Sequence, residues 1–197
     1  RMTGSITAYM DVVGQRPLHM NEFDKAVLAI RDGELEAFKT LLPNLQDRAD
    51  ELFIKTAERP GIVGRKMTML MLDKQPTFSQ GIYRAACLLA IDIADSEKTL
   101  FLLEQAQSHV TDLPVQFYGD IAECAYMDHP HIAAQIIDCC TPEQMDAVPA
   151  DLLYKAMVQN DYRFAYKLAE KGICADDSIQ EIAGYCARNA QNWDIES

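Results

Sequence analysis

The chain has 197 residues, of which 49% are hydrophobic and 24% are charged, and its formal net charge is −12. This composition is ordinary for a folded globular protein and provides enough apolar residues for a sizeable core. The acidic charge argues against a nucleic-acid binder, which needs a basic face, and against binding to anionic membranes. It is consistent with simple solubility or with a partner protein that has a basic surface.

No stretch of the sequence reaches the roughly 18 to 20 uncharged apolar residues that a membrane helix needs. The longest candidate, residues 85–94, is shorter and includes Asp92. No positively charged leader precedes an apolar block, so we expect no secretory signal. The six cysteines form no C-x-x-C pair, and most lie in apolar helical patterns where a free thiol packs as a small hydrophobe. We therefore expect a cytoplasmic, reducing compartment.

Residues 1–20 do not fit the pattern that organises the rest of the chain, and we expect them to form an N-terminal extension or a cap. From residue 21 onward an alanine recurs at intervals of 28 to 35 residues: Ala29, Ala57, Ala90, Ala125, Ala156 and Ala187. Four residues after the first five of these stands a turn former or a small polar residue: Gly33, Gly61, Ala94, His129 and Asn160. Glycine and asparagine tolerate the left-handed backbone that a tight turn between two helices requires.

Further columns complete this repeat. Five residues after most of the alanines stands an acidic residue or a proline, which suits the first turn of a helix: Glu34, Asp95, Pro130 and Asp161. Twelve residues after the alanine comes a large aliphatic side chain that we expect to fill the seam between units: Leu41, Met69, Leu102, Ile137 and Leu168. Proline or glycine then ends the second helix: Pro43, Pro76, Pro114, Pro142 and Gly172. Each unit is thus predicted to be a helix A, a turn, a helix B and a loop.

The repeat predicts an all-α fold, an α-solenoid of about five to six stacked helical hairpins over residues 21–197. The sixth unit reaches Ser197 inside its second helix, so we expect the last hairpin to be incomplete. The alternative is that unrelated helices align by chance. It stays open because the second unit is irregular and Gly61 and Gly64 weaken its second helix.

This pattern resembles the ankyrin-repeat family, whose repeat of about 33 residues consists of two antiparallel helices and a turn. The family's central alanine, with a turn residue four positions later, is matched by Ala29 with Gly33 and by Ala156 with Asn160. The resemblance covers residues 21–197 and implies an ankyrin-like stack of helical hairpins.

Two other parts of the family pattern give opposite results. The leucines of the family's helix B are matched by Leu41, Leu42 and Leu168. The Thr-Pro-Leu-His signature, which braces neighbouring repeats through hydrogen bonds, is absent, since residues 24–27 read Asp-Lys-Ala-Val and residues 151–154 read Asp-Leu-Leu-Tyr. We therefore expect a degenerate ankyrin-like stack, and a tetratricopeptide or HEAT-like stack is the alternative.

Two groups of residues have side chains that could support chemistry. The segment 61–68, with Lys55 and Arg59, forms a basic island that is either a solvated patch or a binding spot for an acidic group. It lacks the spacing of a phosphate-binding loop. A second group contains metal-ligand types in an order that matches no zinc template: Cys124, His129, His131, Cys139 and Cys140. We expect no metal, no other cofactor and no enzymatic activity.

The stacked hairpins predict a scaffold that binds another protein on a concave face, and the acidic charge predicts that it binds neither nucleic acid nor membrane. The ankyrin resemblance implies which face binds. The outer side of the A helices and the loops between repeats would form that face. The outward positions are expected one residue before each alanine and two or three residues after it. The candidate partner-binding residues at these positions are Arg31, Thr56, Arg59, Asp92, Met127, Asp128, Lys155 and Gln159. The alternative is a recruiting or targeting domain of a larger multidomain enzyme or effector.

Overall fold

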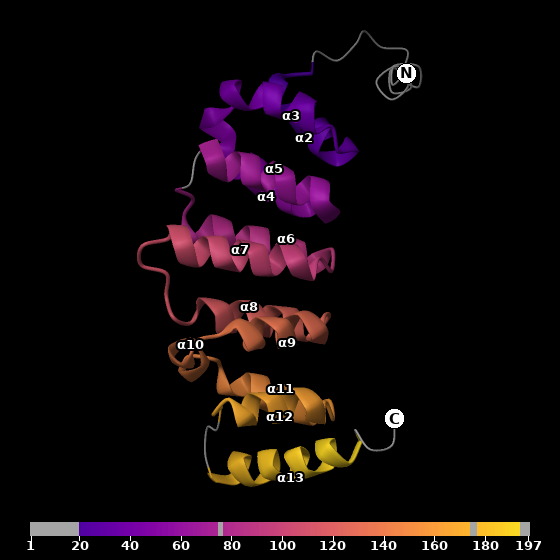
Figure 1. Cartoon of the computed structure of the whole chain (residues 1–197), viewed down its shortest axis with the longest axis vertical. Coiled ribbons are helices and arrows are strands. Elements are labelled where there is room, and N and C mark those ends of the chain that lie inside the picture. Colours follow the sequence, from indigo (N-terminus) through magenta and orange to yellow (C-terminus); the bar gives the residue numbers. More distant parts are fainter. Residues whose placement is uncertain (1–19, 75–76, 174–176, 194–197) are drawn as a thin grey trace.

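A computed structural model describes residues 20–74, 77–173 and 177–193 of the chain. Every regular element in these residues is a helix, which confirms the predicted all-α class. Figure 1 shows the helices arranged in pairs that are stacked one on another along the long axis of the molecule. Across the described ranges, no helix is long and apolar enough to cross a membrane.

The first helix of each pair is called its A helix: α2 (Glu22–Asp32), α4 (Ala49–Glu58), α6 (Gln80–Asp92), α8 (Phe117–Tyr126) and α11 (Ala150–Val158). The second is called its B helix: α3 (Leu35–Leu41), α5 (Gly61–Lys74), α7 (Ser96–His109), α9 (Pro130–Cys139) and α12 (Tyr162–Glu170). Short elements join some of the pairs: η1 (Leu42–Asn44), η2 (Gln46–Arg48) and α10 (Pro142–Asp146). A single long helix, α13 (Asp177–Trp193), lies at the other end of the stack from α2 (Figure 1).

Most of the turns inside the hairpins have the left-handed backbone that the sequence predicts. The φ angle is 75° at Gly33, 78° at Gly61 and 55° at Asn160. Ala94 adopts a φ of 57° although its Cβ disfavours this region. The fourth turn differs, with a φ of −137° at His129, because the residue before a proline is pushed toward extended backbone.

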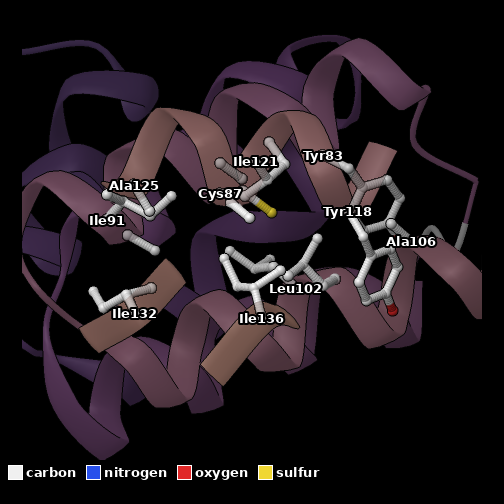
Figure 2. Packing of buried hydrophobic residues seen from close by; sticks show 14 of the residues in the cluster. Tyr83, Cys87, Ile91, Leu102, Ala106, Tyr118, Ile121, Ala125, Ile132 and Ile136 are labelled. Carbon is white, nitrogen blue, oxygen red and sulfur yellow. The ribbon is translucent and has the colours of Figure 1, made fainter. Parts of the chain in front are cut away.

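The repeat alanines lie in the interior, where neighbouring helices approach each other. In the five hairpins they are all buried: Ala29, Ala57, Ala90, Ala125 and Ala156. Figure 2 shows the core between the third and fourth hairpins, where Cys87 and Ile121 of the A helices and Leu102 and Ile136 of the B helices line one seam. Burial raises the pKa of the Cys87 thiol, so this cysteine packs as a small hydrophobe, as the sequence predicts.

The aliphatic column twelve residues after the alanine is completely buried in the last three hairpins: Leu102, Ile137 and Leu168. In the second hairpin the prediction is wrong, because Met69 has 50% of its surface exposed. The reason is that α5 begins four residues after Ala57, whereas the other B helices begin five or six residues after their alanines. Its buried face is therefore rotated around the helix, and Met67 and Met71 enter the core instead.

The sixth unit also differs from its prediction. The predicted incomplete hairpin requires a turn between Ala187 and Ser197, but α13 continues without a break to Trp193. No glycine or proline follows Ala187 to interrupt the helix. The unit is therefore a single helix that packs against α12. The predicted N-terminal extension or cap falls on residues that lie, apart from Met20, outside those the structure describes.

Two aspartates, each five residues after a repeat alanine, join successive hairpins. Asp95 caps α7 by accepting from a first-turn amide at 3.0 Å, and its second oxygen accepts from the Gly61 amide of the preceding hairpin at 3.2 Å. Asp161 caps α12 in the same way, and its second oxygen accepts from the hydroxyl of Tyr126 at 3.1 Å. These bonds brace neighbouring hairpins although the Thr-Pro-Leu-His signature is absent.

Replacing Asp161 with alanine is expected to lower the free energy of unfolding by about 2–3 kcal/mol. The change removes a helix cap and leaves the hydroxyl of buried Tyr126 without its acceptor. Tyr126→Phe removes one hydrogen bond and should cost about 1 kcal/mol. Urea unfolding followed by circular dichroism measures both. Asp128→Ala, at an exposed residue, is the control, and an Asp161→Ala effect as small as the control would contradict the bracing role.

Candidate functional site

The structure exposes five of the eight predicted partner-binding residues: Arg31, Asp92, Met127, Asp128 and Gln159. Lys155 and Arg59 are half-buried. Thr56 is completely buried, so its predicted outward position is wrong. Its hydroxyl donates to the carbonyl of Phe53 at 2.7 Å and lies 2.9 Å from the hydroxyl of Thr68, because the position before the alanine faces α5 in this hairpin.

Two contacts with the same spacing join α8 to α11. The ammonium of Lys155 lies 2.6 Å from Oε1 of Glu123, and Nε2 of Gln159 lies 3.4 Å from Sδ of Met127. The hydrogen bond to Glu123 raises the pKa of Lys155, so this cation is held by its partner. Both contacts link residues 32 apart in the sequence, so the two helices run parallel and in register.

An exposed apolar cluster lies beside these contacts. Met127 has 56% of its surface exposed, and Tyr154 and Val158 have 62% each. Tyr154 and Val158 are one helical turn apart on α11, so they share a face of that helix. The register between the helices places Val158 level with the end of α8, where Met127 stands. Large apolar side chains that gather on a surface mark a site of interaction.

Exposed carboxylates lie at both ends of this cluster. Asp120 and Asp151 are in the first turns of α8 and α11, and Asp128 follows the end of α8. None of the three forms an ion pair with another residue of the described ranges. The cluster and its carboxylates are called the α8–α11 surface: Asp120, Met127, Asp128, Asp151, Tyr154 and Val158.

Sequence reasoning selected Met127 and Asp128 and missed the other members of this surface. Val158 stands two residues after its alanine, as Met127 does, so the same register would have found it. Tyr154 was missed because it lies two residues before the alanine, a position that the register did not include. Periodicity within one helix cannot show which apolar residues a neighbouring helix will leave uncovered.

The basic island predicted around residues 61–68 is engaged by the protein itself. Nζ of Lys55 lies 3.0 Å from Oε1 of Glu58, and Nη1 of Arg65 lies 2.5 Å from Oε2 of Glu97. The guanidinium of Arg59 donates to the backbone carbonyl at residue 31, near the end of α2, at 2.6 Å. These contacts favour a structural and solvated role for the island over a site for an acidic ligand.

A buried lysine links the second and third hairpins at the same place. The ammonium of Lys98, on α7, donates to the carbonyl of Thr56 at 2.8 Å and to the carbonyl of Arg59. These carbonyls lie at and just after the end of α4, where regular helical hydrogen bonding stops. The Thr56 carbonyl also accepts from the Arg59 amide at 3.3 Å. Gly64 makes room for this contact, since a Cβ there would overlap the Arg59 carbonyl and would lie 2.6 Å from the ammonium.

Two hollows in the described surface are both smaller than typical ligand pockets. One has a volume of about 10 Å³, which holds no more than a water molecule. The other has a volume of about 270 Å³ and is open to solvent between α3 and α5. It falls below the roughly 300–1,000 Å³ of typical ligand pockets. Its lining is mixed in charge: Leu35, Glu36, Lys39, Lys66, Met69, Leu70 and Asp73.

The cysteine and histidine residues with metal-ligand side chains do not converge on one site. Cys124 and Cys139 are exposed and Cys140 is half-buried. The rings of His129 and His131 lie edge to face, with centroids 5.9 Å apart. Among residues 20–74, 77–173 and 177–193, no group of three or more His, Cys, Asp or Glu side chains could hold a metal ion.

No family model, no curated protein and no solved structure matches this chain. The resemblance to ankyrin repeats therefore remains a prediction. Among the described residues, the α8–α11 surface is the most distinctive exposed arrangement of side chains.

Gly64→Ala is expected to lower the free energy of unfolding by about 2–3 kcal/mol, because the new Cβ overlaps a backbone carbonyl. Gly184→Ala in α13 is the matched control. The nearest atom to its Cβ belongs to the flexible side chain of Arg188, at 3.7 Å, so alanine should be neutral or should stabilise by up to about 1 kcal/mol. Urea unfolding at pH 7 measures both, and equal effects would show that Gly64 tolerates a side chain.

The buried Lys98 is expected to make stability rise with pH. Burial lowers the pKa of Lys98 from 10.5 to about 8; the charge of Asp95 opposes this shift, and Arg65 and Arg59 add to it. Between these two values the unfolded state holds more protons than the folded state, so the free energy of unfolding increases with pH. Relative to Lys98→Met, the native chain should gain on the order of 3 kcal/mol over this range. A difference in the free energy of unfolding between the native chain and Lys98→Met that does not change from pH 7 to pH 10 would contradict this.

Proposed function

We propose that this chain is a protein-interaction scaffold that binds a partner protein through the outer face of its A helices. Stacked hairpins offer an extended row of helices, and repeat proteins use such rows for binding. The left-handed turns at Gly33, Gly61, Ala94 and Asn160 support an ankyrin-like solenoid. The free thiols of the described cysteines support a reducing, cytoplasmic setting.

The observation that carries this proposal is the exposure of Met127, Tyr154 and Val158 on two neighbouring A helices. Contiguous apolar surface exposed to water is costly, and a bound partner removes that cost at about 25 cal/mol per Å² of apolar area covered. Tyrosine and methionine are enriched at protein interfaces, where a large side chain adds contact area. The partner is therefore expected to cover the end of α8 and the outer face of α11.

Affinity capture from a cytosolic lysate, with mass spectrometry of the retained proteins, tests this proposal. The bait is the full chain, compared with the double variant Tyr154→Ser, Val158→Ser. A partner that binds the outer face should be retained by the native chain and depleted at least tenfold with the double variant, because losing two anchors costs more than about 1.4 kcal/mol.

The matched control is Ile62→Ser, which removes an apolar side chain that is 63% exposed on the B helix α5. This variant should retain the same partner as the native chain. Circular dichroism melting of all three proteins verifies that folding is unchanged. If the native chain and the double variant retain the same proteins, the outer face of α11 is not the binding site.

A further inference from the structure

We propose that the α8–α11 surface binds a cationic, amphipathic peptide segment, in which large apolar side chains are flanked by lysine or arginine. This inference rests on the proposed function and adds the chemistry of the partner to it. The surface has an apolar centre of Met127, Tyr154 and Val158, and exposed carboxylates stand at both of its ends. A segment with the opposite arrangement of charge would cover both kinds of group at once.

The carboxylates of the surface are available to a cationic partner. Asp120, Asp128 and Asp151 are exposed and have no ion pair with any described residue. A lysine or arginine of the partner could therefore pair with each of them without displacing an existing contact. Complementary charge of this kind directs a partner to the site and excludes partners of the wrong sign.

The cations near the surface do not cancel this charge. Lys155 is level with Glu123 on the neighbouring helix and is held by it at 2.6 Å, and the nearby charge of Asp151 also contributes to its raised pKa. Arg84, on the neighbouring A helix α6, places Nη2 at 3.9 Å from Sγ of Cys124. Cys124 is four residues from both Asp120 and Asp128 on the chain, so Arg84 borders these carboxylates. Together with Glu123 and Asp151 they still outnumber the two cations, Arg84 and Lys155.

The ends of the A helices add negative potential. The final carbonyl groups of a helix carry a partial negative charge, and α8 ends at Tyr126 next to Asp128. The exposed Asp92 is the last residue of the parallel helix α6. A second copy of this chain, with the same net charge of −12, is disfavoured as the occupant because like charges repel.

The spacing of the carboxylates sets the pattern that a partner must have. Asp120 and Asp128 are eight residues apart, which corresponds to about 12 Å along a helix axis. The partner therefore needs basic residues about 12 Å apart with apolar side chains between them. This is a separation of about eight residues in a helical segment or about four in an extended one.

Selection from a random library of phage-displayed linear peptides against the full chain identifies the preferred chemistry without choosing it beforehand. Peptides of about 16 residues are long enough to span this distance in either conformation. Counter-selection uses the Tyr154→Ser, Val158→Ser variant. We expect the recovered peptides to be net positive, with large apolar residues between their basic residues.

A synthetic peptide from this selection then tests the carboxylates by fluorescence anisotropy. The triple variant Asp120→Asn, Asp128→Asn, Asp151→Asn should weaken binding at least about tenfold, and added salt should weaken binding to the native chain. The control neutralises three exposed carboxylates elsewhere, with the same change in net charge: Asp47→Asn, Asp50→Asn and Glu104→Gln. The control should bind within about twofold of the native chain, because charges beyond the Debye length are screened.

The possible results separate this inference from the proposed function. Acidic or neutral peptides that are lost with the Tyr154→Ser, Val158→Ser variant would overturn the cationic partner and leave the proposed function standing. Equal weakening by the two triple variants would show attraction to net charge alone and would also overturn the cationic partner. Recovery of no peptide that distinguishes the native chain from the double variant would overturn both. Self-association of the native chain that the Asp variants change would identify a second copy as the occupant.

Discussion

The coverage of each helical hairpin by its neighbours is the constraint on which the rest of this structure depends. The paired helices are short, from 7 residues in α3 to 14 in α7, and isolated helices of such length are marginal in water. Their stability comes from the seams, where buried alanines let helices approach and aliphatic side chains such as Leu102 and Ile136 fill the space between hairpins. A hairpin without a neighbour would leave one of these apolar faces exposed.

Polar contacts then fix how the hairpins sit on one another, and they differ from seam to seam. Between the second and third hairpins, Lys98 and Asp95 bond to the end of α4 and the start of α5. Between the fourth and fifth, Asp161 bonds to Tyr126, whose ring stacks on Phe164 at 4.7 Å. A buried lysine is costly because its charge loses water. Here the ammonium of Lys98 binds the carbonyls of Thr56 and Arg59 at and just after the end of α4. An exact repeat would use the same contact at every seam, whereas in this chain each seam has its own.

The stacking of the hairpins also determines which side chains remain exposed to a partner protein. The A helices use one face for the seam and present the other to solvent, and contacts such as Lys155 with Glu123 hold neighbouring A helices parallel. In the second hairpin the predicted outward residues make contacts within the protein, since Thr56 is buried and Arg59 donates a hydrogen bond to the first hairpin. In the fourth and fifth hairpins Met127, Tyr154 and Val158 remain uncovered. The proposed site follows from that difference between units.

The sequence by itself determined the all-helical class, the boundaries of the first five hairpins and most turn positions, because alanine spacing and residues such as Gly33 and Asn160 act locally on the backbone. Helix phase in the second hairpin was decided by tertiary structure, where the early start of α5 turns Met69 out of the core and brings in Met67 and Met71. The unbroken α13 is different, because the lack of glycine or proline after Ala187 is itself a feature of the sequence. The candidate site was predicted in part, through Met127 and Asp128. Val158 shares the register of Met127 and was within reach of the sequence. The exposure of the other members depends on how α8 and α11 lie side by side, which is a property of two helices together that neither helix's own periodicity contains.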